Sequence, residues 1–270
     1  LSGAVFGLYS DADCKNLITK LPATDANGEA SAQIVKTQDT VYLKEITAPS
    51  GYRINATAYN VKLEVSKTTT VTVPDEEQLG QLTVYKEGEV LTGADVTENG
   101  TTFRYEKRRQ KGAVYNVYAG ADITTAYGTK VYSKGDLVKE NLTTDSNGAV
   151  ILKNLHLGTY VVKEVQAPEG YLRNADDVYT FAFSYTNDKE AKLTFKHTFK
   201  NERVTAKISL QKQDKETKKA VPQGDATLEK AVYGLYARED IVHPDGATGV
   251  IYKAGEQVAT LTTDKNGQAS

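Results

Sequence analysis

The chain contains one passage three times, and this repetition constrains its fold more than any other feature. The copies lie at 3–9, 112–118 and 230–236, and each carries the pattern Ala-Val-aromatic-x-x-Tyr. Each copy is followed by a Thr-Asp-x-Asn-Gly segment, and these segments recur about 120 positions apart, the spacing of a domain rather than of a solenoid repeat. The sequence therefore predicts a tandem array of one domain-sized module.

A further signature, Lys-Glu-x-x-Ala-Pro-x-Gly-Tyr, follows the first two copies, at 44–52 and 163–171. The first copy has no counterpart of the sequence that precedes the other two, and the third copy stops soon after its turn. We therefore expect a partial first module at 1–77 that lacks its first strand. A complete middle module is expected at 78–203, and a partial third module that lacks its C-terminal strands at 204–270. On this interpretation the chain is a piece of a longer protein.

The composition excludes several classes of protein. A formal net charge of -2 with 39% apolar residues is not that of a basic nucleic-acid binder or an acidic disordered tail. No apolar run is long enough to cross a membrane, so we expect no membrane contact within this segment. We find no Gly-rich phosphate loop, and His156, His197 and His243 are not clustered in sequence. We therefore expect no cofactor, no metal and no catalysis on an external substrate.

Short stretches with a period of two predict the secondary structure. Such alternation occurs at 82–86, 195–201 and 208–212, between Asn-Gly and Pro-x-Gly turns. The pattern indicates antiparallel strands with one face on a core. It predicts an all-β fold of tandem β-sandwich modules, each with about seven strands. For the insertion at 87–111 we expect a short helix or a long hairpin, with the charged run 106–111 as a solvated loop.

The alternation also carries polar side chains onto the apolar faces of strands. Lys86, Glu164 and Asn201 all point inward in the middle module, and Glu45 does so in the first. An isolated charge in an apolar core costs several kcal/mol, so these groups need partners.

Two interpretations fit this pattern, and the spacing does not separate them. In the first, Lys86 and Glu164 form a buried salt bridge and Asn201 hydrogen-bonds to it. In the second, burial transfers the proton from Lys86 to Glu164, because desolvation disfavours both charges. The neutral amine then attacks the Asn201 side-chain carbonyl while Glu164 shuttles protons to the leaving ammonia, which yields a Lys-Asn isopeptide bond.

The ordered set of motifs resembles the Cna B-type, or SpaA-type, pilin modules of Gram-positive surface proteins. The matching features are a Lys-bearing first strand, the repeated aromatic passage, the Thr-Asp-x-Asn-Gly turn, the Lys-Glu-x-x-Ala-Pro box and a last strand ending in Phe-Lys-Asn. The resemblance implies a reversed immunoglobulin-like (prealbumin-like) sandwich. It also implies an autocatalytic isopeptide bond from Lys86 to Asn201, with Glu164 as the catalytic residue.

The same alignment assigns roles in the partial modules. Asp75 takes the acceptor position of the first module, with Glu45 as its catalytic residue and water as the leaving group; its Lys would lie before Leu1. Lys212 takes the nucleophile position of the third module, whose Glu and Asn would lie beyond Ser270. We therefore expect at most one internal bond. An open alternative is strand exchange, in which Lys212 of one copy complements Asp75 of another.

The resemblance implies a structural function. We expect a stalk segment of a cell-surface adhesin or pilin, outside the cell and attached to the Gram-positive cell wall through regions beyond this chain. Its partners would be the neighbouring modules of the same chain, and its only chemistry a single reaction on itself. The alternative is a module that binds a host matrix or cell-surface protein through the long loops at 87–111 or 123–139. The sequence contains no match to the Lys-containing motif of polymerising pilins, which favours an adhesin stalk over a pilus shaft.

Overall fold

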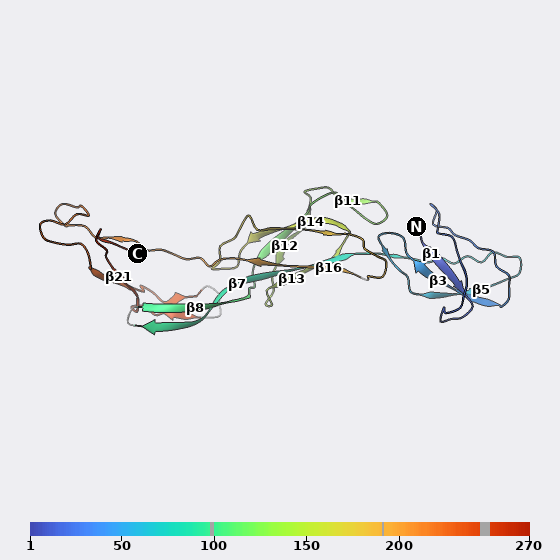
Figure 1. Cartoon of the computed structure of the whole chain (residues 1–270), viewed down its shortest axis with the longest axis horizontal. Helices are drawn as coiled ribbons and strands as arrows, with labels where there is room; N and C mark the ends of the chain where they lie inside the picture. Colours follow the sequence, from blue (N-terminus) through green and yellow to red (C-terminus); the bar gives the residue numbers. More distant parts are fainter. Residues whose placement is uncertain (98–99, 191, 244–248) are drawn as a thin grey trace.

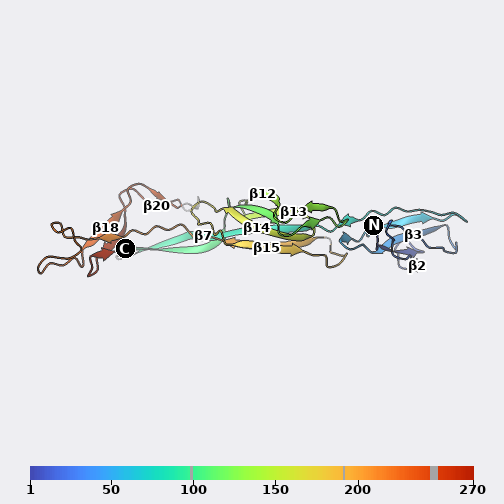
Figure 2. The ribbon, with the colours of Figure 1, turned by 90° about the horizontal axis from the view of Figure 1, so that it is seen from above.

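The computed structural model describes residues 1–97, 100–190, 192–243 and 249–270. Every regular element in these ranges is a β-strand, which confirms the predicted all-β class. The molecule is elongated: the first, middle and third modules follow one another along its long axis, and the N-terminus lies in the module at one end (Figures 1 and 2).

Most strands are short, and β7 is the longest. In chain order they are β1 (Val5–Tyr9), β2 (Leu17–Lys20), β3 (Thr40–Thr47), β4 (Tyr52–Arg53), β5 (Ala58–Lys62), β6 (Glu76–Glu77), β7 (Gly80–Thr97), β8 (Gly100–Arg109), β9 (Val114–Ala119), β10 (Ile123–Thr124), β11 (Lys130–Tyr132), β12 (Leu137–Thr143), β13 (Ala149–Leu155), β14 (Gly158–Gln166), β15 (Val178–Phe183), β16 (Leu193–Lys200), β17 (Leu210–Gln211), β18 (Val232–Tyr236), β19 (Ile241–Val242), β20 (Val250–Tyr252), β21 (Gln257–Thr262) and β22 (Gln268–Ala269).

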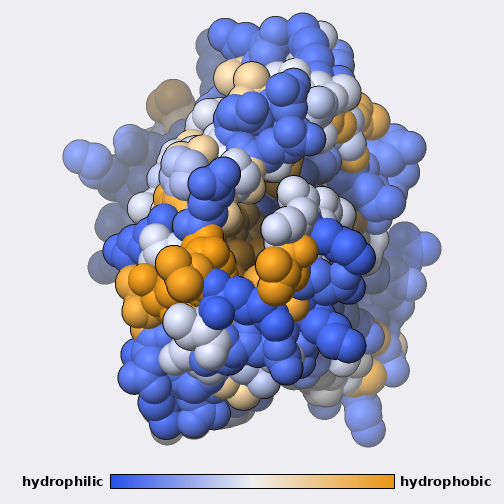
Figure 3. Space-filling model, turned by 90° about the vertical axis from the view of Figure 1, so that its right-hand side faces the viewer, coloured by the Kyte–Doolittle hydropathy of each residue, from blue (hydrophilic) through white to orange (hydrophobic). Residues whose placement is uncertain are grey.

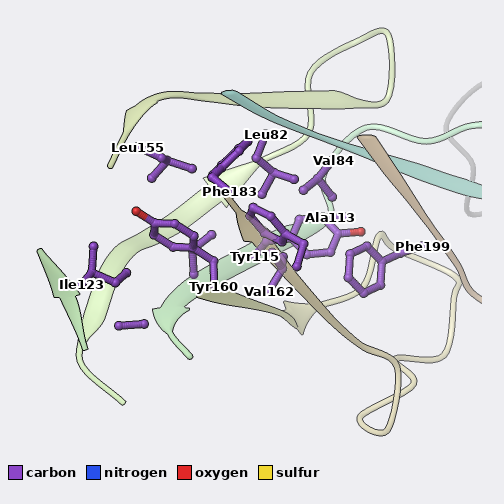
Figure 4. Packing of buried hydrophobic residues seen from close by; sticks show 13 residues of the cluster. Leu82, Val84, Ala113, Tyr115, Ile123, Leu155, Tyr160, Val162, Phe183 and Phe199 are labelled. Carbon is purple, nitrogen blue, oxygen red and sulfur yellow. The ribbon is translucent and has the colours of Figure 1, made fainter. Parts of the chain in front are cut away.

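The middle module is a sandwich of two sheets. One sheet has the order β12-β9-β14-β15, and the other has the order β13-β7-β16. Strand β7 pairs antiparallel with β13 and parallel with β16, so the first and last strands of this module lie side by side. The core between the sheets is largely aromatic and β-branched (Figure 4), and it includes Leu82, Val84, Tyr115, Val117, Tyr160, Val162, Phe181, Phe183 and Phe199.

The repeated Thr-Asp-x-Asn-Gly segments form the same turn in all three modules. The hydroxyl of Thr24, Thr144 or Thr263 accepts a hydrogen bond from the backbone N–H of the Ala in the repeated passage, at 2.9, 3.1 and 2.9 Å. The Asp that follows accepts backbone N–H groups two and four residues later. The final Gly has a positive φ of 81°, 64° or 71°, a conformation that favours glycine. The two motifs recur together because each turn is tied to the start of a core strand.

The insertion in the middle module is a long hairpin. Strands β7 and β8 pair from Glu87 opposite Arg109 to Thr97 opposite Gly100. The expectation that 106–111 is a solvated loop is wrong for 106–109, which belong to β8. Charged side chains do not mark a loop here, because this ribbon extends beyond the sandwich and the side chains of 106–109 are exposed on it.

The far part of the hairpin contacts the third module. The ring of Phe103 meets that of Tyr252 edge-on, with centroids 5.9 Å apart, and Tyr105 lies 6.2 Å from the ring of His243. Figure 1 shows the hairpin extending along the molecule toward β21. The insertion therefore adds contacts between the middle and third modules beyond the connecting chain itself.

The first and third modules form fewer of the expected strands. Residues 71–75 alternate between half-buried and exposed, as expected for a last strand, but they form no ladder. The counterpart β16 forms its ladder with β7, whereas no described strand pairs with residues 71–75. In the third module the strand expected at 208–212 is reduced to β17, which pairs with β22 alone, and Ile208 is exposed.

The end of the first module presents apolar surface. Figure 3 views the molecule from this end and shows apolar side chains gathered around a hollow. Around the six buried core residues of this module lie six partly buried ones: Leu21, Ile34, Tyr59, Leu63, Val71 and Val73. The core of the first module is therefore covered less completely than that of the middle module.

Candidate cross-linking site

Three polar residues meet in the core of the middle module. Lys86 lies on β7, and Asn201 follows the last residue of β16, the strand that pairs with β7 in parallel. Glu164 lies on β14 in the facing sheet. Lys86 has no exposed surface, and Glu164 and Asn201 are 3% and 7% exposed. The sandwich thus places on one side of its core a Lys and an Asn from adjacent strands, and a Glu opposite them.

The Glu164 carboxylate contacts both other residues. Its Oε1 lies 2.8 Å from Lys86 Nζ. Asn201 Nδ2 donates hydrogen bonds to the two oxygens of Glu164, at 3.1 and 2.9 Å. One carboxylate therefore stands within proton-transfer distance of the amine and of the amide nitrogen.

Burial shifts the amine toward its neutral form. Desolvation lowers the pKa of the Lys86 ammonium, and the hydrogen bond and charge of Glu164 oppose this shift. A lysine with a lowered pKa is the usual source of a nucleophilic amine in a protein. The site thus places a lysine amine, a carboxylate and a side-chain amide together in the buried core.

The aromatic residues Tyr115 and Phe199 pack beside this group, with ring centroids 4.9 Å apart. Tyr115 lies opposite Glu164 in the β9–β14 register. Burial, and then the Glu164 charge, raises the pKa of Tyr115, so its hydroxyl stays protonated. Among the described residues this hydroxyl has no hydrogen-bond partner, and neither has Asn201 Oδ1. Sequence reasoning did not single out Tyr115, although its place in the repeated passage was a signal.

The first module brings together Glu45 and Asp75, two carboxyl groups without a lysine. Glu45 is 3% exposed, and its Oε2 accepts the backbone N–H of Asn55 at 2.6 Å. Burial, followed by the neighbouring Asp75 charge, raises the pKa of Glu45 to about 7. Burial also raises the pKa of Asp75. These shifts favour a proton held between the two carboxyl groups.

Lys212 lies apart from the other predicted site residues. Its Nζ donates to the hydroxyl of Tyr233 at 3.5 Å and stands 5.9 Å from the centre of that ring. The third module lies at the opposite end of the molecule from the first (Figure 1), so Lys212 cannot reach Asp75 of the same chain.

Within the described ranges, no three His, Cys, Asp or Glu side chains are grouped so that they could hold a metal ion. No helix in those ranges is long and apolar enough to cross a membrane.

Comparison with known proteins relates the chain to surface proteins of bacteria. The family model described as the SpaA prealbumin-like fold domain matches residues 1–77 and 99–198. A collagen adhesin of Staphylococcus aureus is 29% identical over 147 residues, which are 50% of this chain and 12% of the adhesin. The chain therefore spans a small part of that relative.

A solved structure of another bacterial protein shows the same fold. The structure of the Bacillus anthracis TIE protein matches with a TM-score of 0.58 and 22% identity, over 100% of this chain and 39% of that chain. GBS52, the minor pilin of Streptococcus agalactiae, matches with a TM-score of 0.31 and 19% identity, over 77% of this chain and 86% of that chain.

Proposed function

Because the chain belongs to the family of SpaA prealbumin-like fold domains, we propose that it is a stalk segment of a cell-surface adhesin or pilin, stiffened by an isopeptide bond between Lys86 and Asn201. The observation that carries this proposal is the single buried carboxylate of Glu164, which contacts both the amine and the amide. The segment acts outside the cell, and regions beyond this chain attach it to the Gram-positive cell wall. Its partners are the neighbouring modules.

The reaction needs only the three side chains. The Lys86 ammonium passes a proton to Glu164, and the neutral Nζ attacks Cγ of Asn201. The protonated Glu164 gives its proton to the amide nitrogen and takes one from the attacking nitrogen, the Cγ–Nδ2 bond breaks, and neutral ammonia leaves. The product is a neutral secondary amide beside a protonated Glu164, so the core no longer contains a buried ion pair, whose desolvation is costly.

The proposed bond would let the middle module transmit tension through a covalent link between its first and last strands. Strands β7 and β16 run in parallel, and Lys86 lies opposite Phe199, two residues before Asn201. A bond between the two strands closes a loop of about 115 residues, worth on the order of 4 to 5 kcal/mol by the loop-entropy argument used for disulfides. Tension that enters at one strand would leave through the other without separating the sheets.

The partial modules fit the same scheme with partners from outside this chain. In the first module Asp75 would accept a lysine with Glu45 as catalyst, and water would leave in place of ammonia. In the third module Lys212 would be the nucleophile. Strand exchange between copies would join these two halves, and it requires Lys212 to leave its contact with Tyr233.

Binding of a host protein is the second candidate function. The hairpin at 87–111 gives it little support, because Phe103 contacts the third module. The loop at 123–139 supports it better, since Tyr127 is 78% exposed there. Binding of matrix proteins to the whole chain, lost on Tyr127→Ala, would favour this function.

An intact-mass measurement tests the bond. The purified chain should be lighter than its sequence by one ammonia, and Lys86→Ala, Glu164→Ala and Asn201→Ala should each restore the full mass. Lys163→Ala, which replaces an exposed lysine beside Glu164, is the matched control and should keep the deficit. A wild-type chain of full mass would refute the bond.

A further inference from the structure

The loop between β15 and β16 of the middle module docks on the first module. Asp188 in this loop is 9% exposed. Its Oδ2 accepts the backbone N–H of Ala48 at 2.9 Å, and its backbone carbonyl accepts the N–H of Ile54 at 2.9 Å. Ala48 belongs to the Lys-Glu-x-x-Ala-Pro box. One residue of the middle module therefore holds both ends of the segment 48–54 of the first.

The connection between the two modules is tied to the same loop. Gln78 has no exposed surface, and its side-chain amide donates to the carbonyl groups of Asn187 at 3.1 Å and Glu190 at 2.9 Å. Its backbone N–H donates to the carbonyl of Gly51 at 2.8 Å. A buried glutamine with these partners fixes the connecting residues to both modules, whereas a flexible linker would be solvated.

A second set of contacts also joins the first and middle modules. Glu77 Oε1 accepts the backbone N–H of Ala126 at 2.8 Å and lies 3.0 Å from Nδ1 of His156. Gly51, with a positive φ of 87°, approaches Ala126 so closely that a Cβ added there would lie 2.8 Å from the Ala126 methyl group. The two modules thus meet through specific polar contacts and a close backbone approach.

The docked segment leads directly to the Glu45 carboxylate. Asn55, whose N–H donates to Glu45 Oε2 at 2.6 Å, follows Ile54, whose N–H is held by Asp188. We propose that Asp188 is a positioning residue through which the middle module fixes both the angle of the first module and the donor that holds Glu45. This deepens the stalk proposal and rests on it for its biological use, while the contacts themselves do not depend on the Lys86–Asn201 bond.

Spin labels on the full chain test the fixed angle. Cys14 is the only cysteine, and Lys139→Cys adds a second label on an exposed position of β12. Pulsed electron resonance should give a narrow distance distribution between the two labels. Asp188→Ala should widen it about twofold, because domains without a tight interface move relative to one another. Asp188→Asn keeps an oxygen acceptor and should retain the narrow distribution.

Amide hydrogen exchange tests the link to Glu45. Asp188→Ala should accelerate exchange of the Asn55 amide roughly fivefold or more, because loss of the Ala48 hydrogen bond loosens the loop whose Asp188 carbonyl holds the neighbouring Ile54 amide. Asp188→Asn should not, and Asp176→Ala, at an exposed aspartate of the same module, is the matched control. Asp188→Glu, which displaces the carboxylate by one methylene, is expected to act like the Ala variant and serves if that variant folds poorly.

Two results would overturn the proposal: an unchanged distance distribution in Asp188→Ala, or an unchanged Asn55 exchange rate. The mass deficit of the middle module should persist in all Asp188 variants. If the chain lacked that mass deficit but the Asp188 variants still changed the distance distribution and the Asn55 exchange rate, the isopeptide bond would be refuted. The proposal for Asp188 would still hold.

Discussion

The middle and first modules place the same Lys-Glu-x-x-Ala-Pro box in opposite charge environments. Glu164 faces the ammonium of Lys86 at 2.8 Å, whereas Glu45 faces the carboxyl group of Asp75. The second arrangement raises the pKa of Glu45 to about 7, mainly by burial and then by the like charge. The comparison teaches that the box supplies a buried carboxyl group in both modules, whereas the charge that faces it differs: a lysine in the middle module and a second carboxyl group in the first.

The two modules also differ in how their last strands are held. Strand β16 has a full ladder to β7, while residues 71–75 keep the alternating burial of a strand without a ladder. The alternating burial of side chains is thus a local property of the sequence, whereas the hydrogen-bonded ladder requires a neighbouring strand such as β7. In the middle module, strand β7 supplies both the lysine that faces Glu164 and the ladder that holds β16.

The largest expected difference between the modules follows from Glu164→Gln. Without a carboxylate to move protons, the proposed bond should not form, and the unfolding free energy of the middle module should fall by about 4 kcal/mol or more. Calorimetry of the whole chain should show the corresponding transition at a lower temperature. Glu45→Gln is the matched control, and it should leave this transition in place. Equal effects of the two substitutions would contradict a bond confined to the middle module.

The second prediction concerns the pH dependence of the first module. Because folding raises the pKa of Glu45 to about 7, the folded state holds a proton that the unfolded state releases near pH 4.5. The contribution of Glu45 to stability is therefore fully present below about pH 4.5 and is lost as the pH rises toward 7, with a slope from this group of at most about 1.4 kcal/mol per pH unit. Chemical unfolding of this module between pH 4 and 8 would measure the slope, and Glu45→Gln should flatten it. A rise in stability over this range would refute the assigned shift.

The third prediction is a smaller and opposite trend in the middle module. Burial lowers the pKa of His197, whose ring stacks on Tyr179 with centroids 3.9 Å apart. A histidine with a lowered pKa stabilises the fold above its unfolded value of about 6.5, and this contribution is lost as the pH falls through the folded value. The middle module should therefore lose some stability on acidification, while the first gains it. His197→Phe should remove the trend, and unfolding followed at pH 5 and pH 7 would show whether it does.

Much of the candidate site could be predicted from the sequence. Alternation placed Lys86, Glu164 and Asn201 on inward faces because a strand has a period of two, and the structure buries all three. Their contact distances could not be obtained in this way, since they depend on how two sheets pack. The role of Lys86, Asn201, Asp75 and Lys212 in cross-links stays a prediction.

Other features were beyond local patterns. The hairpin of β7 and β8 was ambiguous because its half-buried residues Phe103 and Tyr105 pack on another module and not on the core of their own. Asp188 gave no signal at all: its partner Ala48 is 140 positions away, and an aspartate in a loop usually caps a turn. Interactions between modules depend on their relative placement, which the sequence of one repeat does not contain.

The smallest expected effect concerns Tyr115, whose position in the first module is occupied by Phe6. The Tyr115 hydroxyl is buried and has no partner among the described residues, so Tyr115→Phe keeps the packing on Phe199 and removes only an unsatisfied group. The stability of the middle module should change by less than about 1 kcal/mol, in the stabilising direction. Tyr160→Phe is the matched control: its hydroxyl donates to the carbonyl of His156 at 2.8 Å, and its loss should destabilise by about 1 kcal/mol.

The same Tyr115 variant sharpens the comparison between the sites around Glu164 and Glu45. If the Tyr115 hydroxyl takes no part in the proposed reaction, the Tyr115→Phe chain should lose ammonia as completely as the wild type, because Lys86, Glu164 and Asn201 are unchanged. Mass spectrometry during refolding would give the rate. A rate lowered tenfold or more would show that the Tyr115 hydroxyl takes part in the reaction. Its raised pKa keeps the proton on this hydroxyl, close enough to Glu164 to feel its charge. The middle module would then possess a proton donor that the first module, with Phe6 at this position, lacks.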